Sequence, residues 1–338
     1  MKRLLPVLLL VAGCHTPDGS SPSMKLTYPT TAKLDQTDDY HGTKISDPYR
    51  WLEDDNSAET KAWVEAQNKV TFGYLEKIPQ RAAIKQRITK LWNYERWGMP
   101  FKEGGRWFIT RNDGLQNQSV LYTMRALDET PRVLLDPNKL STDGTVALQS
   151  YSVSDDGKLM AYATSASGSD WIEIKVRDIE SGVDKPDLIK WAKSTHPAWT
   201  KDGTGFFYSR YDEPAATNQF KGVNYFHKLY YHRVGAAQSD DELVYHRPDQ
   251  KEWGFGAGVT DEGRYLAISV WKGTDTKNRF FYRDLTVPGA TMVELLNDFD
   301  ADYGFIDNVG PVFYFRTDLD APRGRVIAID TTKPARDN

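Results

Sequence analysis

Short runs of aromatic and β-branched residues, each opened by a glycine turn, recur along most of the chain. The turn-then-strand units lie at 102–110, 154–163, 200–209, 260–269 and 307–316, with turn glycines Gly105, Gly157, Gly203, Gly263 and Gly310. These glycines are 46 to 60 residues apart, and a second run follows each unit, beginning at Val120, Ile172, Lys228, Arg279 and Arg325. Glycine supplies the positive φ that a tight hairpin needs, and this period is about that of one four-stranded propeller blade.

The repeat predicts a mainly β body over residues 93–338, with about five propeller blades, one of them partial. The alternative is a β-sandwich, whose strands also alternate in hydrophobicity, but sandwiches lack a period this long. Under the propeller interpretation most of the aromatic side chains belong to blade cores.

Residues 25–92 have a different pattern, which predicts helices. Between Ser57 and Lys77 the apolar residues recur near helical spacing, and a second helical stretch follows Pro79. The segment 47–55 precedes both, where Asp-Pro starts a turn and aromatic residues provide apolar anchors. We therefore expect a short helical cap in front of the propeller.

Composition excludes some functions. The 338 residues contain 43 Lys plus Arg and 47 Asp plus Glu, a net charge of -4 with both signs scattered. No basic stripe is available to neutralise a phosphate backbone, so we expect no nucleic-acid partner. Cys14 is the single cysteine, which excludes an internal disulfide and a thiolate metal cluster, and the six histidines lack zinc-ligand spacing. We predict no metal and no cofactor.

The N-terminus has the pattern of an export signal. Lys2 and Arg3 precede a short apolar run, which ends in small residues directly before Cys14. This pattern resembles the bacterial lipobox, so we expect residues 1–14 to be a lipoprotein signal, with Cys14 lipidated, and residues 15–24 to be a flexible tether in the cell envelope. The alternatives are an ordinary cleaved signal, or a cytoplasmic protein that starts at Met24.

Catalytic residues are not evident in the chain. No stretch reads G-x-S-x-G, the turn that exposes a nucleophilic serine. The nearest candidates are Ser167 and Ser169 around Gly168, but the second glycine is missing and a strand is expected where a helix should follow. The carboxylates near Ser141 and Thr142 are typical of turns and strand starts, where such side chains hydrogen-bond to backbone groups. We assign no catalytic residue.

Three alternating aspartates, Asp298, Asp300 and Asp302, are spaced like the first ligands of a calcium loop. Gly304 then comes one place late, and Val309 stands where an EF-hand needs its last glutamate. We therefore interpret these residues as solvated carboxylates in a loop between blades.

Several quoted segments together resemble the prolyl oligopeptidases. They are YHGTKISDPYRWLED with VEAQN, GLQNQSVLY (114–122), LDPNKLSTDGTVAL, SASGSDW (165–171), AWTKDGTGFFY (198–208) and KLYYHRVG. The likeness runs from about Leu26 to the end, in order. GLQNQ and SASGSDW are typical of the prolyl-specific branch, whereas DPYRWLED is shared with sister groups.

The resemblance implies a two-domain serine peptidase. A seven-bladed propeller would gate access for short proline-containing peptides. The helical cap would form part of an α/β-hydrolase domain, and the rest of that domain would lie outside these 338 residues. The triad would follow the propeller, so none of it transfers to this chain, which we expect to be inactive alone and monomeric at full length. In the family, blade side chains line part of the peptide pocket. By rough alignment that region falls near Ser194, Gly254, Phe255 and Thr274, and we assign no contacts to these residues. The rival hypothesis is a surface-tethered propeller that binds peptides without cutting them.

Overall fold

The computed structural model describes residues 26–215 and 222–335. The expected signal, Cys14, the tether and Met24 all lie outside these residues. The chain divides into two compact units, 1–91 and 92–338.

The first unit is a hairpin followed by two helices. Its elements are β1 (Thr37–Tyr40), β2 (Thr43–Ser46), η1 (Arg50–Glu53), α1 (Ala58–Leu75) and α2 (Arg81–Trp92), the last of which ends just past the division. Ser57 caps α1, because its hydroxyl accepts a hydrogen bond from the backbone N–H of Thr60 at 3.1 Å. Both helices lie where the spacing of apolar residues predicts them.

The two helices leave their apolar side chains largely uncovered. Ile84, Ile88 and Leu91 of α2 are each more than half exposed, and Thr60 is the one buried residue within the described helices α1 and α2. Trp63 is tied down by a hydrogen bond from its indole N–H to the hydroxyl of Thr31, at 2.9 Å. In the part of the chain that is described, no helix combines the length and apolarity needed to cross a membrane.

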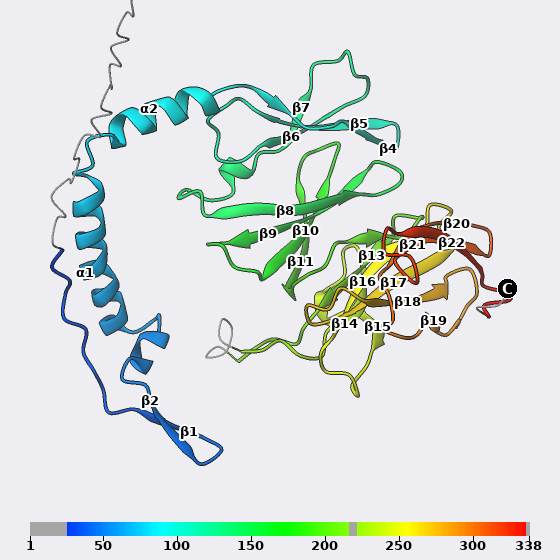
Figure 1. Ribbon diagram of the computed structural model, residues 1–338. Coiled ribbons are helices and arrows are strands. Elements are labelled where there is room, and N and C mark those ends of the chain that lie inside the picture. The colour runs from blue at the N-terminus through cyan, green and yellow to red at the C-terminus, as the bar shows by residue number, and fades with distance from the viewer. Residues whose placement is uncertain (1–25, 216–221, 336–338) are drawn as a thin grey trace, which may run out of the picture. The chain divides into compact units, whose positions relative to one another are not determined.

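The second unit is built from antiparallel blades (Figure 1). The first blade contains β3 (Arg96–Trp97), β4 (Phe101–Glu103), β5 (Arg106–Asn112), β6 (Val120–Met124) and β7 (Arg132–Leu135); after η2 (Pro137–Lys139), the second contains β8 (Val146–Val153), β9 (Leu159–Ala166), β10 (Ile172–Asp178) and β11 (Asp184–Ala192). The third contains β12 (Ala198–Trp199), β13 (Gly205–Arg210), β14 (Lys228–Arg233), η3 (Gln238–Asp240) and β15 (Glu242–His246). The fourth contains β16 (Trp253–Val259), β17 (Tyr265–Lys272), β18 (Asn278–Asp284) and β19 (Val293–Leu296), and the fifth β20 (Tyr303–Val309), β21 (Val312–Thr317) and β22 (Arg325–Asp330).

The expected repeat is confirmed at its turns. All five turn glycines have positive φ, between 55° and 76°. The described residues thus form a propeller portion of five blades, of which the fifth has three strands. Consecutive strands within a blade are neighbours, except that β3 and β4 of the first blade both pair with β5.

The apolar core lies between blades. Four buried clusters pair successive blades, and each mixes residues from both. The cluster between the first and second blades includes Phe108 and Tyr162, and the cluster between the fourth and fifth includes Phe280 and Phe313. These four aromatic side chains are at most 1% exposed, and burial of each stabilises the fold by about 1.5–3 kcal/mol.

The glycine turns hold the blades close together. Gly104 has a φ of +53°, and a Cβ built on it would overlap the backbone nitrogen of Gly157 in the next blade. Gly157 also has positive φ, at +68°. Two backbones therefore touch where side chains cannot fit, and the approach fixes the spacing of the first two blades.

This close approach predicts the effect of Gly104→Ala. The substitution combines a left-handed backbone penalty with overpacking, and we expect the free energy of unfolding to fall by about 2–4 kcal/mol. Gly105→Ala is a matched control, because Gly105 has a φ of +76° but open space around its Cβ position. For Gly105→Ala the free energy of unfolding, measured by urea unfolding, should fall by only about 1–2 kcal/mol. Equal losses for the two variants would contradict the backbone contact.

Candidate functional site

A row of aromatic rings crosses the second, third and fourth blades at the strand ends opposite the glycine turns. It consists of Trp191, Trp171, Tyr211, His227, Phe255 and Trp271. Trp171 lies edge-on to Trp191 and Tyr211, with centroids 5.9 and 6.0 Å apart. The Tyr211 ring lies 4.5 Å from His227, which is 6.3 Å from Phe255 and 5.8 Å from Trp271. We call this set the aromatic row.

A bulge in β11 directs Trp191 into the row. The pairing of β10 with β11 is shifted between Ile172 and Ile174, so that two residues of β11 stand opposite one of β10. Trp191 has a φ of +62°, which is costly for a bulky L-residue. Bulges re-aim side chains, and backbone strain of this kind concentrates at functional sites.

The turn between β9 and β10 directs Trp171. Ser167 and Gly168 have positive φ, the N–H of Ser169 donates to the carbonyl of Ala166 at 3.0 Å, and its hydroxyl accepts from the N–H of Trp171 at 3.1 Å. Ser167 and Ser169 thus shape a turn. Within residues 26–215 and 222–335, no serine hydroxyl makes a hydrogen bond with a histidine.

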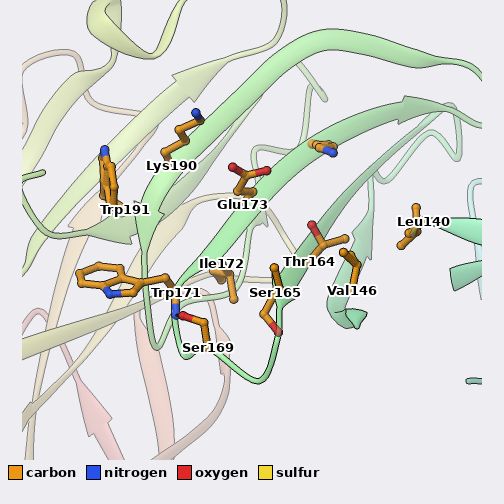
Figure 2. Close-up of a pocket in the computed structure, with 12 residues that line it drawn as sticks. Leu140, Val146, Thr164, Ser165, Ser169, Trp171, Ile172, Glu173, Lys190 and Trp191 are labelled. Atoms are coloured by element: carbon orange, nitrogen blue, oxygen red, sulfur yellow. Dashed lines mark hydrogen bonds between the residues drawn. The ribbon is translucent and has the colours of Figure 1, made fainter. Parts of the chain in front are cut away.

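Two hollows flank this turn. The first, of about 340 Å³, has walls from Trp171, Trp191 and Ile172, with Glu173 and Lys190 at its edge (Figure 2). The second, of about 700 Å³, is more polar and is lined by Gln149, Ser150, Ser169, Asp170, Lys193, Ser194 and His196, among others. Both volumes lie in the range of small-molecule pockets, and aromatic walls with a few polar groups suit a peptide segment.

Lys193 connects the row to the polar hollow. Its ammonium lies 5.5 Å from the centroid of the Trp171 ring and 3.2 Å from the carboxylate of Asp170. A cation over an indole face is attracted by the quadrupole of the ring. Lys193 therefore supports the orientation of Trp171 and places a positive charge beside the polar hollow.

His227 is neutral at the centre of the row. Its ring is buried, and Nδ1 accepts a hydrogen bond from the N–H of Phe255 at 3.0 Å, so the ring proton is on Nε2. Burial lowers the pKa of His227 from 6.5 to about 4. The imidazole acts here as an uncharged aromatic ring.

The residues aligned with a family pocket lie around this region, but not all of them lie in it. Ser194 lines the polar hollow. Phe255 is a member of the aromatic row, and Gly254 leaves space for the ring of Trp271. Thr274 lies in the exposed turn between β17 and β18.

Sequence reasoning missed the rest of the row, because most of its residues were interpreted as blade core. One signal was available for Trp171, which follows the unusual SASGSD turn. The bulge that turns Trp191 has no glycine or proline to mark it.

The alternating aspartates do not form a metal site in the structure. Asp300 accepts a hydrogen bond from the Tyr303 hydroxyl at 2.8 Å, and the backbone N–H of Asp302 donates to Asp318, also at 2.8 Å. Among the described residues, no group of three or more potential ligands could hold a metal ion. The Asp300 carboxylate and the Asp302 backbone N–H thus tie this loop to residues of the fifth blade.

Comparison with known proteins identifies the family. Residues 29–338 match the family model described as the prolyl oligopeptidase N-terminal beta-propeller domain. The chain belongs to the prolyl oligopeptidase family. A prolyl endopeptidase from Elizabethkingia meningoseptica is 40% identical over 309 residues, which cover 91% of this chain and 43% of that protein. Prolyl oligopeptidase A from Amanita bisporigera is 35% identical, over 91% of this chain and 45% of that protein.

Solved structures of the family agree with the fold. Prolyl oligopeptidase B from Galerina marginata, bound to a 35mer hydrolysis and macrocyclization substrate, superposes with a TM-score of 0.80 at 33% identity. The match covers 90% of this chain and 46% of that one. The chain thus spans less than half the length of these relatives.

The lowered pKa of His227 predicts an acid-sensitive site. The unfolded state takes up a proton near pH 6.5 and the folded state only near pH 4, so stability falls as the pH drops through this window. His227→Gln keeps an acceptor for the Phe255 N–H and does not titrate. We expect the unfolding constant of the wild type, relative to the variant, to rise up to about tenfold per pH unit on acidification. The exposed His196→Gln should not change the slope; parallel curves for wild type and His227→Gln would contradict the assignment.

Proposed function

We propose that this chain is the N-terminal part of a serine peptidase that cleaves short peptides after proline. In this proposal the propeller portion binds and gates the peptide, and a hydrolase domain outside these 338 residues performs the cleavage. The observation that supports it most directly is the aromatic row beside two hollows at one set of strand ends.

The chemistry of the row suits proline-containing peptides. Aromatic rings offer large apolar faces at low conformational cost, and a proline ring packs on such faces without an N–H to satisfy. The hydroxyl of Ser194 and the ammonium of Lys193 lie beside the second hollow, where they can bind peptide carbonyl groups. The hollows would thus hold an extended peptide segment by its side chains and its backbone.

The cleavage step requires groups that are not brought together among residues 26–215 and 222–335. Acyl transfer needs a serine activated by a histidine, an oxyanion hole and a deacylating water. The exposed apolar residues of α2, Ile84, Ile88 and Leu91, support the presence of a further domain, because contiguous apolar patches mark contact surfaces. We propose that the hydrolase domain covers them.

A second candidate function is peptide binding without cleavage. The strained Trp191 and the ordered aromatic row favour it as much as the first, since both functions need the same recognition surface. The two candidates differ in whether the reading frame after codon 338 encodes a G-x-S-x-G turn with a later aspartate and histidine.

A peptidase assay tests the division of labour. The 338-residue chain should show no turnover of a fluorogenic peptide with an internal proline, whereas a product that includes the downstream frame should cleave it. Turnover by the isolated chain would overturn the proposal that catalysis lies outside it. Absence of cleavage by the longer product would favour the binding module.

Peptide binding by the 338-residue chain tests the role of the aromatic row. Trp171→Ala removes the ring that contacts both Trp191 and Tyr211, and we expect affinity for a proline-containing octapeptide to fall about tenfold, or about 1.4 kcal/mol. Trp97→Ala is the control, because Trp97 is an exposed tryptophan of the first blade, 49% exposed, that makes none of the ring contacts of the row. Isothermal titration calorimetry measures the affinity of each variant for the peptide. Equal affinities of Trp171→Ala and Trp97→Ala would exclude the row as the peptide site.

The lipid anchor remains a separate proposal. Cys14 should incorporate radiolabelled palmitate in a bacterial host, and Cys14→Ala should abolish the label. Persistent label in the variant would refute lipidation at this residue. An unlabelled wild-type chain would favour the cleaved signal or the start at Met24.

A further inference from the structure

A histidine between two aspartates joins the second and third blades. His232 of β14 is fully buried, and its Nδ1 lies 2.7 Å from Oδ1 of Asp241, while its Nε2 lies 3.0 Å from Oδ1 of Asp187. The side chains of both aspartates are at most 1% exposed. Asp187 belongs to β11 of the second blade, and Asp241 follows η3 in the third. We call these three residues the junction triad.

Counting donors fixes the protonation of the triad. An ionised carboxylate only accepts hydrogen bonds, so a ring with a carboxylate at each nitrogen must donate from both. Both carboxylates also receive other donors, since the Tyr208 hydroxyl donates to Asp241 at 2.6 Å and the N–H of Gly235 donates to Asp187. With a carboxylate oxygen within hydrogen-bond distance of each ring nitrogen, the arrangement suits an imidazole that carries a proton on both nitrogens.

The surroundings of the triad point the same way. The charged and titratable groups that face it are Asp187 from β11, Tyr208 and Arg210 from β13, and Asp241 between η3 and β15. Burial acts to lower the pKa of His232, but hydrogen bonds to Asp241 and Asp187 outweigh it, and the pKa is raised above 6.5. Close charged hydrogen bonds retain strength in a buried site, because no water screens them.

The backbone contributes little to this junction. The pairing of β11 with β13 consists of one residue pair, Ala192 with Arg210, although both blades belong to a single eight-stranded sheet. Asp187 lies five residues before that pair, toward the other end of β11. Side chains therefore carry much of the contact between the two blades there. The triad acts beside two hydrogen bonds between the Gln238 side chain and the backbone of Lys190, at 3.0 and 2.9 Å.

We propose that the junction triad is a proton-dependent lock between the second and third blades, closed when His232 is doubly protonated. Loss of the proton removes one of the two hydrogen bonds. It also leaves two buried carboxylates around a neutral ring, which weakens the junction, since uncompensated buried charge is strongly destabilising. The lock is independent of the peptide site, because no residue of the triad lines either hollow.

Urea unfolding of the 338-residue chain from pH 5.5 to 9.5 tests the lock. The sign follows from the raised pKa: the stabilisation is complete below about pH 6.5 and is lost as the pH rises through the pKa of the folded state. In that window the unfolding constant of the wild type should rise about tenfold per pH unit, and that of His232→Gln should not show this rise. A constant difference between the two proteins at every pH would overturn the proposal.

Two further measurements cover a variant that fails to fold. Asp187→Asn keeps an acceptor but removes a charge, so the wild-type pH transition should move to lower pH; an unmoved transition contradicts the lock. Nitrogen-15 NMR of the wild-type imidazoles should show one ring that stays doubly protonated as the pH is raised above 6.5, and the absence of such a ring would exclude the lock. The exposed His196→Gln serves as the control with an unchanged profile.

Discussion

Each blade of the propeller unit buries its apolar faces against its neighbours, and the rest of the structure depends on that packing. A single antiparallel sheet of four short strands has no core of its own, so the stabilising burial must come from contact between sheets. The four buried clusters follow this rule, because each joins one blade to the next. The fold is therefore a chain of interfaces, and stability is distributed among them.

The two sets of strand ends have different roles in this packing. At the glycine turns of the first two blades, the backbones at Gly104 and Gly157 are in contact. At the opposite ends the connecting segments carry large aromatic side chains, which span the gaps between blades. The tight end thus fixes geometry, while the aromatic end offers surface for recognition. The bulge and the positive φ at Trp191 are tolerated at the aromatic end, because the packed faces of the blade hold β11 in place.

The sequence predicts the repeated elements well and the single features poorly. Turn glycines at regular spacing locate the blades, and the cap at Ser57 locates α1, because both signals are local. The junction triad was not visible, since His232 and Asp187 are 45 residues apart and belong to different blades. Trp171 and Trp191 looked like core, because a ring in a strand pattern carries no mark of the direction in which it points. Local chemistry is encoded locally, but a site made by blade contacts requires the fold.

His227 and His232 show how far contacts decide the behaviour of one residue type. The two lie five positions apart, on either side of the start of β14, and both are buried. At His227 a backbone N–H occupies one ring nitrogen, so burial keeps the ring neutral and lowers its pKa to about 4. At His232 carboxylates occupy both nitrogens, and the pKa is raised. The contribution of His227 to the free energy of unfolding is lost as the pH falls below 6.5, and that of His232 is lost as the pH rises above 6.5. Their combined contribution is therefore greatest near pH 6.5.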